Sequence, residues 1–273
     1  MGGQNVFDFI SQAITDLLTS KLEFLEASGL NLFRGLAIIT LVWFGVKSAV
    51  SSAQGGEGFN FAKFADMLLV IAFGYAMLTY YTSPLPGMQS SFSELVTNEA
   101  QYLSGQIGGN QTQMINDAIS KAEEQLGSPP GTFSFHEELT YFFVYTVLAV
   151  TQGVALAVIA YGFVATAVCV LLGPIFIPFF IVGKLDWLFW GWFRAFLGFA
   201  LYQVVANAFI FIVAKVLLGL LGVIGPVTIS NAYVLMPALI VTLAVCIYGL
   251  IKIPDLTASI VSGRVGISAS PLG

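Results

Sequence analysis

Long apolar stretches, separated by short polar ones, divide the chain into predicted membrane-spanning helices. The first two cover residues 30–50 and 64–81, and two more cover residues 195–221 and 233–251. Each has roughly the 20 apolar residues that one α-helix needs to cross a bilayer. The pattern predicts an all-α fold, a polytopic transmembrane helical bundle.

A longer apolar stretch covers residues 139–172 and carries no charge. As one helix, its 34 residues would extend about 51 Å, well beyond the roughly 30 Å hydrocarbon core of a bilayer. The stretch is therefore either one long helix that projects from the membrane, or two short spans joined by a turn near Tyr161 and Gly162.

The segment Gly173-Pro174-Ile175-Phe176-Ile177-Pro178-Phe179-Phe180 follows directly. Each proline removes a backbone donor and clashes with the preceding turn of a helix. With six spans, both prolines would lie within a span and leave carbonyls in lipid, which is costly. With five, they lie past the end of the long helix, at the cytoplasmic face. The prolines therefore favour about five spans, with Gly173, Pro174 and Pro178 as a structural elbow that dips back into the membrane.

The positive charges do not separate these two topologies. Five spans, with the N-terminus outside, place six basic residues inside and three outside, whereas six spans place seven inside and two outside. Both counts satisfy the excess of basic residues expected on the cytoplasmic side.

The first residues of the chain have a different pattern. Over residues 5–27, apolar side chains recur at helical spacing with charged side chains between them. This predicts an N-terminal amphipathic helix that lies on a membrane surface, binds a partner or packs on its own bundle. Gly29 is expected to end it.

Residues 83–137 form a polar segment with six acidic residues and one basic residue, Lys121. Apolar positions between residues 92 and 103, and again between residues 114 and 126, predict two short helices. We expect a small helical, acidic, extramembrane loop.

Three tryptophans precede the span at residues 195–221. Trp187, Trp190 and Trp192 lie between Lys184 and Arg194, and tryptophan is enriched where a bilayer meets water. These residues are predicted to form an interfacial belt.

Together these patterns divide the chain into six segments. They are the amphipathic helix (1–29), a transmembrane hairpin (30–82), the acidic loop (83–137), the long span with its elbow (138–183), the belt with the last two spans (184–253) and a short cytoplasmic tail (254–273).

Composition supports a membrane protein and offers little for catalysis. Hydrophobic residues make up 57% of the chain and charged residues 9%, against about 25% charged in soluble domains. His136 lies beside Glu137 and Glu138 without the further ligands of a metal site, and Cys169 and Cys246 fall within apolar stretches, where buried thiols are typical. The sequence contains no Walker A, Gly-x-Ser-x-Gly or His-Glu-x-x-His motif. We predict no enzyme activity, no cofactor and no metal.

Polar side chains within the spans are few. Gln203, Asn207 and Lys215 share one face of a predicted helix, where they could line a pore or bond a neighbouring helix. Lys215 could instead extend toward the headgroups. Thr151 and Gln152 form a second polar position, which suits hydrogen bonding between helices.

The combination resembles the TrbL family, the polytopic inner-membrane subunit of type IV secretion and conjugation machines. The resemblance extends over about residues 30–255. It rests on the amphipathic start, the turn Gly55-Gly56-Glu57-Gly58, the extramembrane loop, the Gly-Pro-x-x-x-Pro segment at 173–178 and the tryptophans that follow.

The resemblance implies a non-enzymatic platform and channel subunit that supports pilus assembly and the transfer of DNA or protein. It implies the bacterial inner (cytoplasmic) membrane, with the N-terminus and the acidic loop periplasmic and the C-terminus cytoplasmic. The implied partners are a pilin, other inner-membrane or periplasmic secretion subunits, lipids and, transiently, the transferred substrate. A ring-shaped homo-oligomer, expected to be a pentamer, is also implied.

The alternative hypothesis is a self-sufficient membrane channel or secondary transporter. It is motivated by the polar face of Gln203, Asn207 and Lys215.

Overall fold

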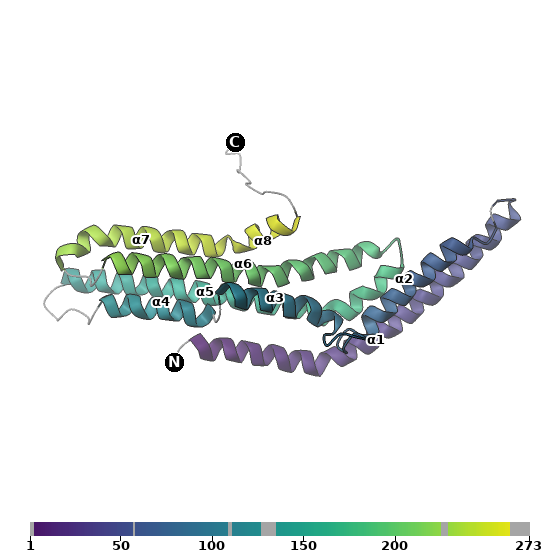
Figure 1. Ribbon diagram of the computed structural model, residues 1–273, viewed down its shortest axis with the longest axis horizontal. Helices are drawn as coiled ribbons and strands as arrows, with labels where there is room; N and C mark the ends of the chain where they lie inside the picture. Colours follow the sequence, from purple (N-terminus) through teal and green to yellow (C-terminus); the bar gives the residue numbers. More distant parts are fainter. Residues whose placement is uncertain (1–2, 57, 109–110, 127–134, 225–228, 263–273) are drawn as a thin grey trace. The chain divides into compact units, whose positions relative to one another are not determined.

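The structure is a computed structural model that describes residues 3–56, 58–108, 111–126, 135–224 and 229–262. These residues form α-helices and one short 3-10 helix, with no strand among them (Figure 1). In chain order the elements are α1 (Gly3–Ala53), α2 (Phe61–Thr79), α3 (Phe92–Gly108), α4 (Gln111–Leu126), α5 (Phe135–Phe176), η1 (Ile177–Ile181), α6 (Asp186–Ile224), α7 (Ile229–Ile251) and α8 (Ile253–Ser262). The prediction of an all-α fold is confirmed.

Helix α1 runs without interruption through Gly29, so the predicted end of a helix at this residue is wrong. The amphipathic segment and the first apolar stretch are parts of one helix of 51 residues. Gly29 is buried inside that helix. Small residues also serve close contact between helices, and this is the role that Gly29 has in the structure.

Local sequence signals set the connection between α1 and α2. Gly55 has a φ of 74°, and the N–H groups of Gly55 and Gly56 bond the carbonyls of Ser52 and Ser51 at 3.2 and 3.0 Å. This pair of bonds is the Schellman motif, which favours glycine at the left-handed position. Asn60 then caps α2, because its side chain accepts a hydrogen bond from the Lys63 N–H.

Helices α3 and α4 occupy the polar segment in which two short helices were predicted. A capping box starts α3. The Ser91 N–H donates to the Glu94 carboxylate at 2.9 Å, and the Glu94 N–H donates to the Ser91 hydroxyl at 3.3 Å.

Helix α5 is one continuous helix of 42 residues, so the alternative turn near Tyr161 and Gly162 is not formed. The expectation that both prolines lie past its end is wrong for Pro174. That proline lies inside the last turn of α5, where it removes a single intrahelical bond. Pro178 lies in η1, which follows the end of α5.

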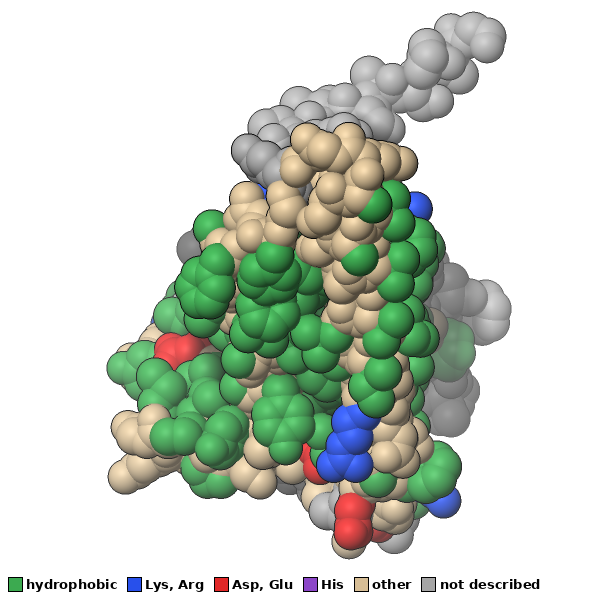
Figure 2. Space-filling view, turned by 90° about the vertical axis from the view of Figure 1, so that its right-hand side faces the viewer, with side chains coloured by type: hydrophobic (Ala, Val, Ile, Leu, Met, Phe, Trp, Pro, Cys, Tyr) green, Lys and Arg blue, Asp and Glu red, His purple; other side chains and the backbone are tan. Residues whose placement is uncertain are grey.

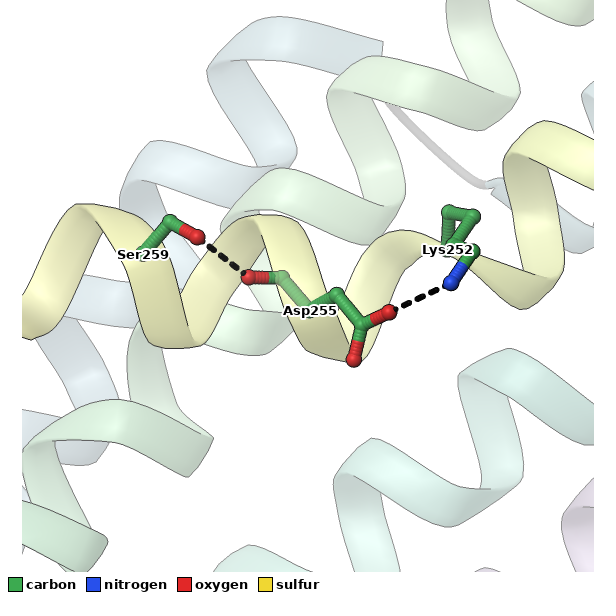
Figure 3. Close-up of polar contacts among 3 residues, drawn as sticks. All are labelled: Lys252, Asp255 and Ser259. Atoms are coloured by element: carbon green, nitrogen blue, oxygen red, sulfur yellow. Dashed lines mark hydrogen bonds and ion pairs between the residues drawn. The ribbon is translucent and has the colours of Figure 1, made fainter. Parts of the chain in front are cut away.

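The segment predicted as a short tail contains a helix. Residues 253–262 form α8, which meets α7 at a bend of 45°, and residues 263–273 lie outside the described part. At the bend, Lys252 Nζ lies 2.8 Å from Asp255 Oδ2, and the Ser259 hydroxyl donates to the Asp255 carbonyl (Figure 3). The two charged side chains are 52% and 70% exposed, so their ion pair contributes at most about 1 kcal/mol.

The chain divides into two compact units, each with its own core. We call Gln12–Glu99 with Val164–Phe199 the elbow unit, and Met1–Ser11, Ala100–Phe163 and Ala200–Gly273 the C-terminal unit. The core of the elbow unit contains large side chains, among them Phe33, Met77, Tyr81, Ile177, Trp192 and Phe196. The C-terminal unit has two clusters of buried side chains. One joins α4, α5, α6, α7 and α8 and includes Ile119, Tyr202, Ala206 and Ile253, and the other joins α4, α5, α6 and α7 and includes Ala118, Leu148, Leu217 and Leu243.

Among the residues that the structure describes, four helical segments are long and apolar enough to cross a membrane: Gln12–Ala53, Phe61–Thr79, Tyr145–Ile181 and Asp186–Gly219. A fifth is present if α7 and α8 are counted as one bent span. This agrees with the prediction of about five spans. On the face drawn in Figure 2, hydrophobic side chains cover most of the described surface and charged side chains are few and scattered.

Candidate functional site

Pro174 and Pro178 each leave one backbone carbonyl without its usual helical donor. In an α-helix the N–H of one residue bonds the carbonyl four residues earlier, and proline has no N–H. The affected carbonyls are those of Val170 and of Pro174 itself. Unpaired carbonyls are costly in a membrane, so the elbow needs donors or covering groups from other segments.

Two side chains supply donors at this point in the elbow unit. The Tyr81 hydroxyl donates to the Val170 carbonyl at 2.6 Å, and Trp192 Nε1 donates to the Cys169 carbonyl at 2.9 Å. Both side chains are buried. Burial raises the pKa of the Tyr81 phenol, with smaller contributions from Cys169 and Glu26. The hydroxyl therefore stays protonated and remains a donor.

Two buried glycines allow other segments to reach the elbow. A methyl group on Gly29 of α1 would overlap the Pro174 carbonyl. A methyl group on Gly173 would overlap the Tyr81 hydroxyl and lie 2.8 Å from the Trp192 ring. The α1 backbone thus covers one freed carbonyl, while Tyr81 binds the other.

The loop after α2 holds Tyr81 in place. The Phe92 N–H donates to the Tyr80 carbonyl at 2.9 Å, and the Ser93 hydroxyl donates to the Tyr81 carbonyl at 2.8 Å. The capping box at the start of α3 fixes this serine segment in turn. A short, hydrogen-bonded loop therefore holds the Tyr81 phenol against the elbow.

Glu26 lies on α1 close to the same site. Its carboxylate contributes to the raised pKa of Tyr81. Glu26 Oε1 is buried and has no hydrogen-bond partner within the described residues. A buried oxygen without a donor is unfavourable, so the elbow retains one unfilled acceptor.

A second feature lies within the C-terminal unit. A pocket of about 210 Å³ opens between residues of α3, α5 and α6. Gln203 and Asn207, two members of the predicted polar face, line it. Lys215 lies elsewhere: it is exposed, and its Nζ is 5.6 Å from the centre of the Phe211 ring. The remaining lining residues are Gln101, Ser104, Gly105, Ile159, Phe163, Tyr202 and Ala206.

Helices α5 and α6 approach closely beside this pocket. A methyl group on Gly162 would lie 2.8 Å from the Tyr202 ring, and Gln203 Nε2 donates to the Gly162 carbonyl at 3.4 Å. Asn207 is only 3% exposed. The pocket is therefore lined by neutral polar side chains against an apolar helix contact.

The elbow and the pocket both lie in a part of the sequence that matches a known family. Residues 37–253 match the family described as TrbL/VirB6 plasmid conjugal transfer protein. The matched residues make up well over half of the chain. The chain belongs to the TrbL/VirB6 family. No curated protein sequence matches it.

Membership confirms the resemblance drawn from the elbow and the tryptophan segment. It makes the chain a component of conjugal transfer or type IV secretion machinery. With four or five candidate spans, this TrbL/VirB6 protein is a multi-pass membrane protein.

The tryptophans of the predicted belt differ in their surroundings. Trp187 and Trp190 are exposed at 64% and 42%, and Lys184 and Arg194 are exposed as well. Trp192 is buried and bonds a carbonyl, which is not the position of an interfacial anchor. Helical spacing gives the reason, because Trp190 and Trp192 lie about 200° apart around α6.

Sequence reasoning missed three residues of these sites. Tyr81 is the last residue of the predicted span 64–81, and nothing near it in the sequence indicates that it is fully buried. Gln101 and Ser104 share a face of α3, but nothing local indicates that this face meets α6. The second polar position is different: Gln152 Nε2 donates to Asn116 Oδ1 of α4 at 2.7 Å, a bond between helices of the expected kind.

The groups considered for metal or thiol chemistry are placed as follows. Within the described ranges, no group of three or more His, Cys, Asp or Glu side chains is arranged to hold a metal ion. Cys169 and Cys246 are free, buried thiols in separate units. His136 lies in the first turn of α5, and its side chain is outside the described part.

Proposed function

We propose that this TrbL/VirB6 protein is a non-enzymatic inner-membrane platform of a type IV secretion machine, on which a pilus is assembled and past which DNA or protein is transferred. The proposed partners are a pilin, other secretion subunits and further copies of the chain in a ring, with a pentamer as the expected size. In the proposed topology, the N-terminus is periplasmic and the C-terminus cytoplasmic.

The observation that carries this proposal is the uncovered apolar surface of the α1–α2 hairpin. In an apolar stretch of 18 residues, only 11% is buried within the chain in α1 and 17% in α2, against 44% in the corresponding stretch of α6. Large side chains such as Ile39, Trp43, Leu69 and Phe73 are more than half exposed. A surface of this size suits lipid, neighbouring copies and apolar pilin helices at once.

Two glycines on the same hairpin support contact with other helices. A methyl group on Gly35 or Gly45 would meet no atom within 4 Å, so neither glycine is needed for packing inside the chain. Small residues at exposed positions let another helix approach closely.

Co-purification from the native host tests the proposal. We expect the tagged protein, extracted in a mild detergent, to bring a pilin and secretion ATPases into the eluate. The variant Pro174→Ala with Pro178→Ala is expected to insert normally but to lose these partners and to lower conjugation at least about tenfold.

The matched control replaces two exposed loop prolines, Pro84→Ala with Pro86→Ala. It is expected to retain the partners and the conjugation frequency of the natural protein. Full conjugation in the elbow variant would remove the elbow from the proposal. An eluate with the protein alone would contradict the platform itself.

The pocket lining favours a second candidate function, a self-sufficient channel, because Gln203 and Asn207 both face one hollow. We expect the purified protein in liposomes to pass neither ions nor small solutes. Flux that is present in the natural sequence and absent in Asn207→Leu would instead establish the channel.

A further inference from the structure

We propose that the pocket between α3, α5 and α6 is a glycerolipid site, in which the Asn207 amide donates to the ester region of the lipid. The proposal is independent of the platform function, since it requires only that the C-terminal unit lies in a membrane.

The lining selects a neutral group. Its polar side chains are those of Gln101, Ser104, Tyr202, Gln203 and Asn207, and none is a lysine, arginine, aspartate or glutamate. A phosphate or carboxylate inside the pocket would find no opposite charge and would be strongly disfavoured away from water. The part of a ligand that enters is therefore uncharged and able to accept or donate hydrogen bonds.

Asn207 provides the unfilled hydrogen-bonding capacity. Its side chain is 97% buried, since 3% is exposed, and it faces the pocket. Among the described residues, no hydrogen bond involves its amide, and its amide atoms are not among the fully enclosed atoms that lack a partner. A carboxamide has two N–H donors and one acceptor oxygen, which can therefore bond a group that enters the pocket. Ester carbonyls are acceptors that match its donors.

From the residues around it, we infer that the pocket lies near the headgroup level of a bilayer. The lining residues of α5 and α6 belong to apolar candidate spans, whereas α3 belongs to the polar segment. Two neighbours of lining residues, Tyr102 and Tyr161, are 63% and 50% exposed. Exposed tyrosine at the junction of a polar helix with apolar spans is typical of the membrane interface, where lipid esters are found.

The size of the pocket fits part of a lipid. Its volume of about 210 Å³ is below the roughly 300 Å³ at which sites for whole drug-sized ligands begin. Ile159, Phe163 and Ala206 form apolar walls beside the amides. We therefore assign the pocket to the glycerol esters and the first methylene groups, with the acyl chains continuing into the bilayer.

Photo-crosslinking tests this site. The probe is phosphatidylethanolamine with a diazirine on an acyl carbon close to the ester, added to the purified full-length protein in nanodiscs. We expect crosslinked peptides to contain residues 101–105, 159–163 or 202–207, and excess unlabelled lipid to compete. Ala206→Phe, which fills the pocket, is expected to reduce this crosslinking at least about tenfold, while Ala195→Phe at an exposed position of α6 is the matched control.

Two milder variants keep the test informative if Ala206→Phe does not fold. Asn207→Leu replaces the amide with an apolar side chain that has the same number of heavy atoms, and Gln101→Leu changes an exposed residue of α3. Each is expected to reduce crosslinking at the pocket about three- to tenfold. The unfolding temperature of each variant is expected to stay close to that of the natural protein. Unchanged crosslinking in both folded variants would overturn the proposal. Labels confined to the exposed α1–α2 hairpin, or a protein partner trapped at the pocket in cells, would overturn it too.

Discussion

Gly29→Ala is expected to destabilise this TrbL/VirB6 protein by about 1–3 kcal/mol, the usual range for overpacking a filled contact. The added methyl group would overlap the Pro174 carbonyl, and a backbone carbonyl cannot turn aside as a flexible side chain can. Helix propensity acts in the opposite direction, because alanine is favoured over glycine within a helix by about 1 kcal/mol. A net loss of stability would therefore be due to the overlap with the Pro174 carbonyl.

The matched control is Gly35→Ala, six residues further along the same helix. A methyl group at Gly35 meets no atom within 4 Å, so this variant is expected to be as stable as the natural protein or more so. Unfolding of both variants by sodium dodecyl sulfate in mixed micelles measures the difference. Equal stability of the two variants would show that α1 does not pack on the elbow as described.

Tyr81→Phe is expected to destabilise the protein by about 1–3 kcal/mol, because it leaves the buried Val170 carbonyl without a donor. The reason for this loss is specific to Pro174, which lacks the N–H that would otherwise bond that carbonyl. Pro174→Ala restores an N–H at that position. We therefore expect Tyr81→Phe to cost much less when Pro174→Ala is also present.

A double-mutant cycle measures this coupling, with an expected interaction of about 0.5–3 kcal/mol. The same unfolding measurement serves all four proteins, and Tyr80→Phe, at the neighbouring half-buried tyrosine, is the control for loss of a phenol hydroxyl. Additive effects of Tyr81→Phe and Pro174→Ala would mean that the hydroxyl does not replace the missing helical donor.

Much of the helical architecture could be predicted from local pattern. The uncharged residues 139–172 were compatible with one long helix or with two short spans. Pro174 and Pro178 favoured the single helix and indicate where it ends, to within a few residues. The two helices of the acidic loop follow from spaced apolar residues. The capping pair Ser91 and Glu94 could also have been predicted, because serine followed three residues later by glutamate is a known signal for the start of a helix.

The elbow contacts could not be predicted in the same way, because they join residues far apart in the chain. Gly29 and Pro174 are separated by more than 100 residues, and a glycine after an amphipathic helix has the same local appearance whether it ends the helix or admits a neighbour. Tyr81 and Val170 are 89 residues apart. Only the fold shows that a phenol takes the place of a missing backbone donor.

The pocket was partly accessible from sequence. Gln203 and Asn207 are four residues apart on one helix and were expected to share a face. That they line the same pocket as Gln101 of α3 depends on tertiary packing. Lys215 shows the limit of such spacing. Eight residues further along α6 than Asn207, just over two turns, it lies about 80° around the helix, outside the pocket and beside Phe211.

The burial of both native thiols has a practical consequence for mapping membrane topology. Cys169 and Cys246 each lie in a hydrophobic core, so neither offers a sulfur atom to water-soluble maleimides. Single cysteines placed in the α1–α2 turn, the acidic loop or α8 therefore report sidedness on the natural sequence. Because both thiols are buried in this packing, neither cysteine has to be replaced before an introduced cysteine is labelled.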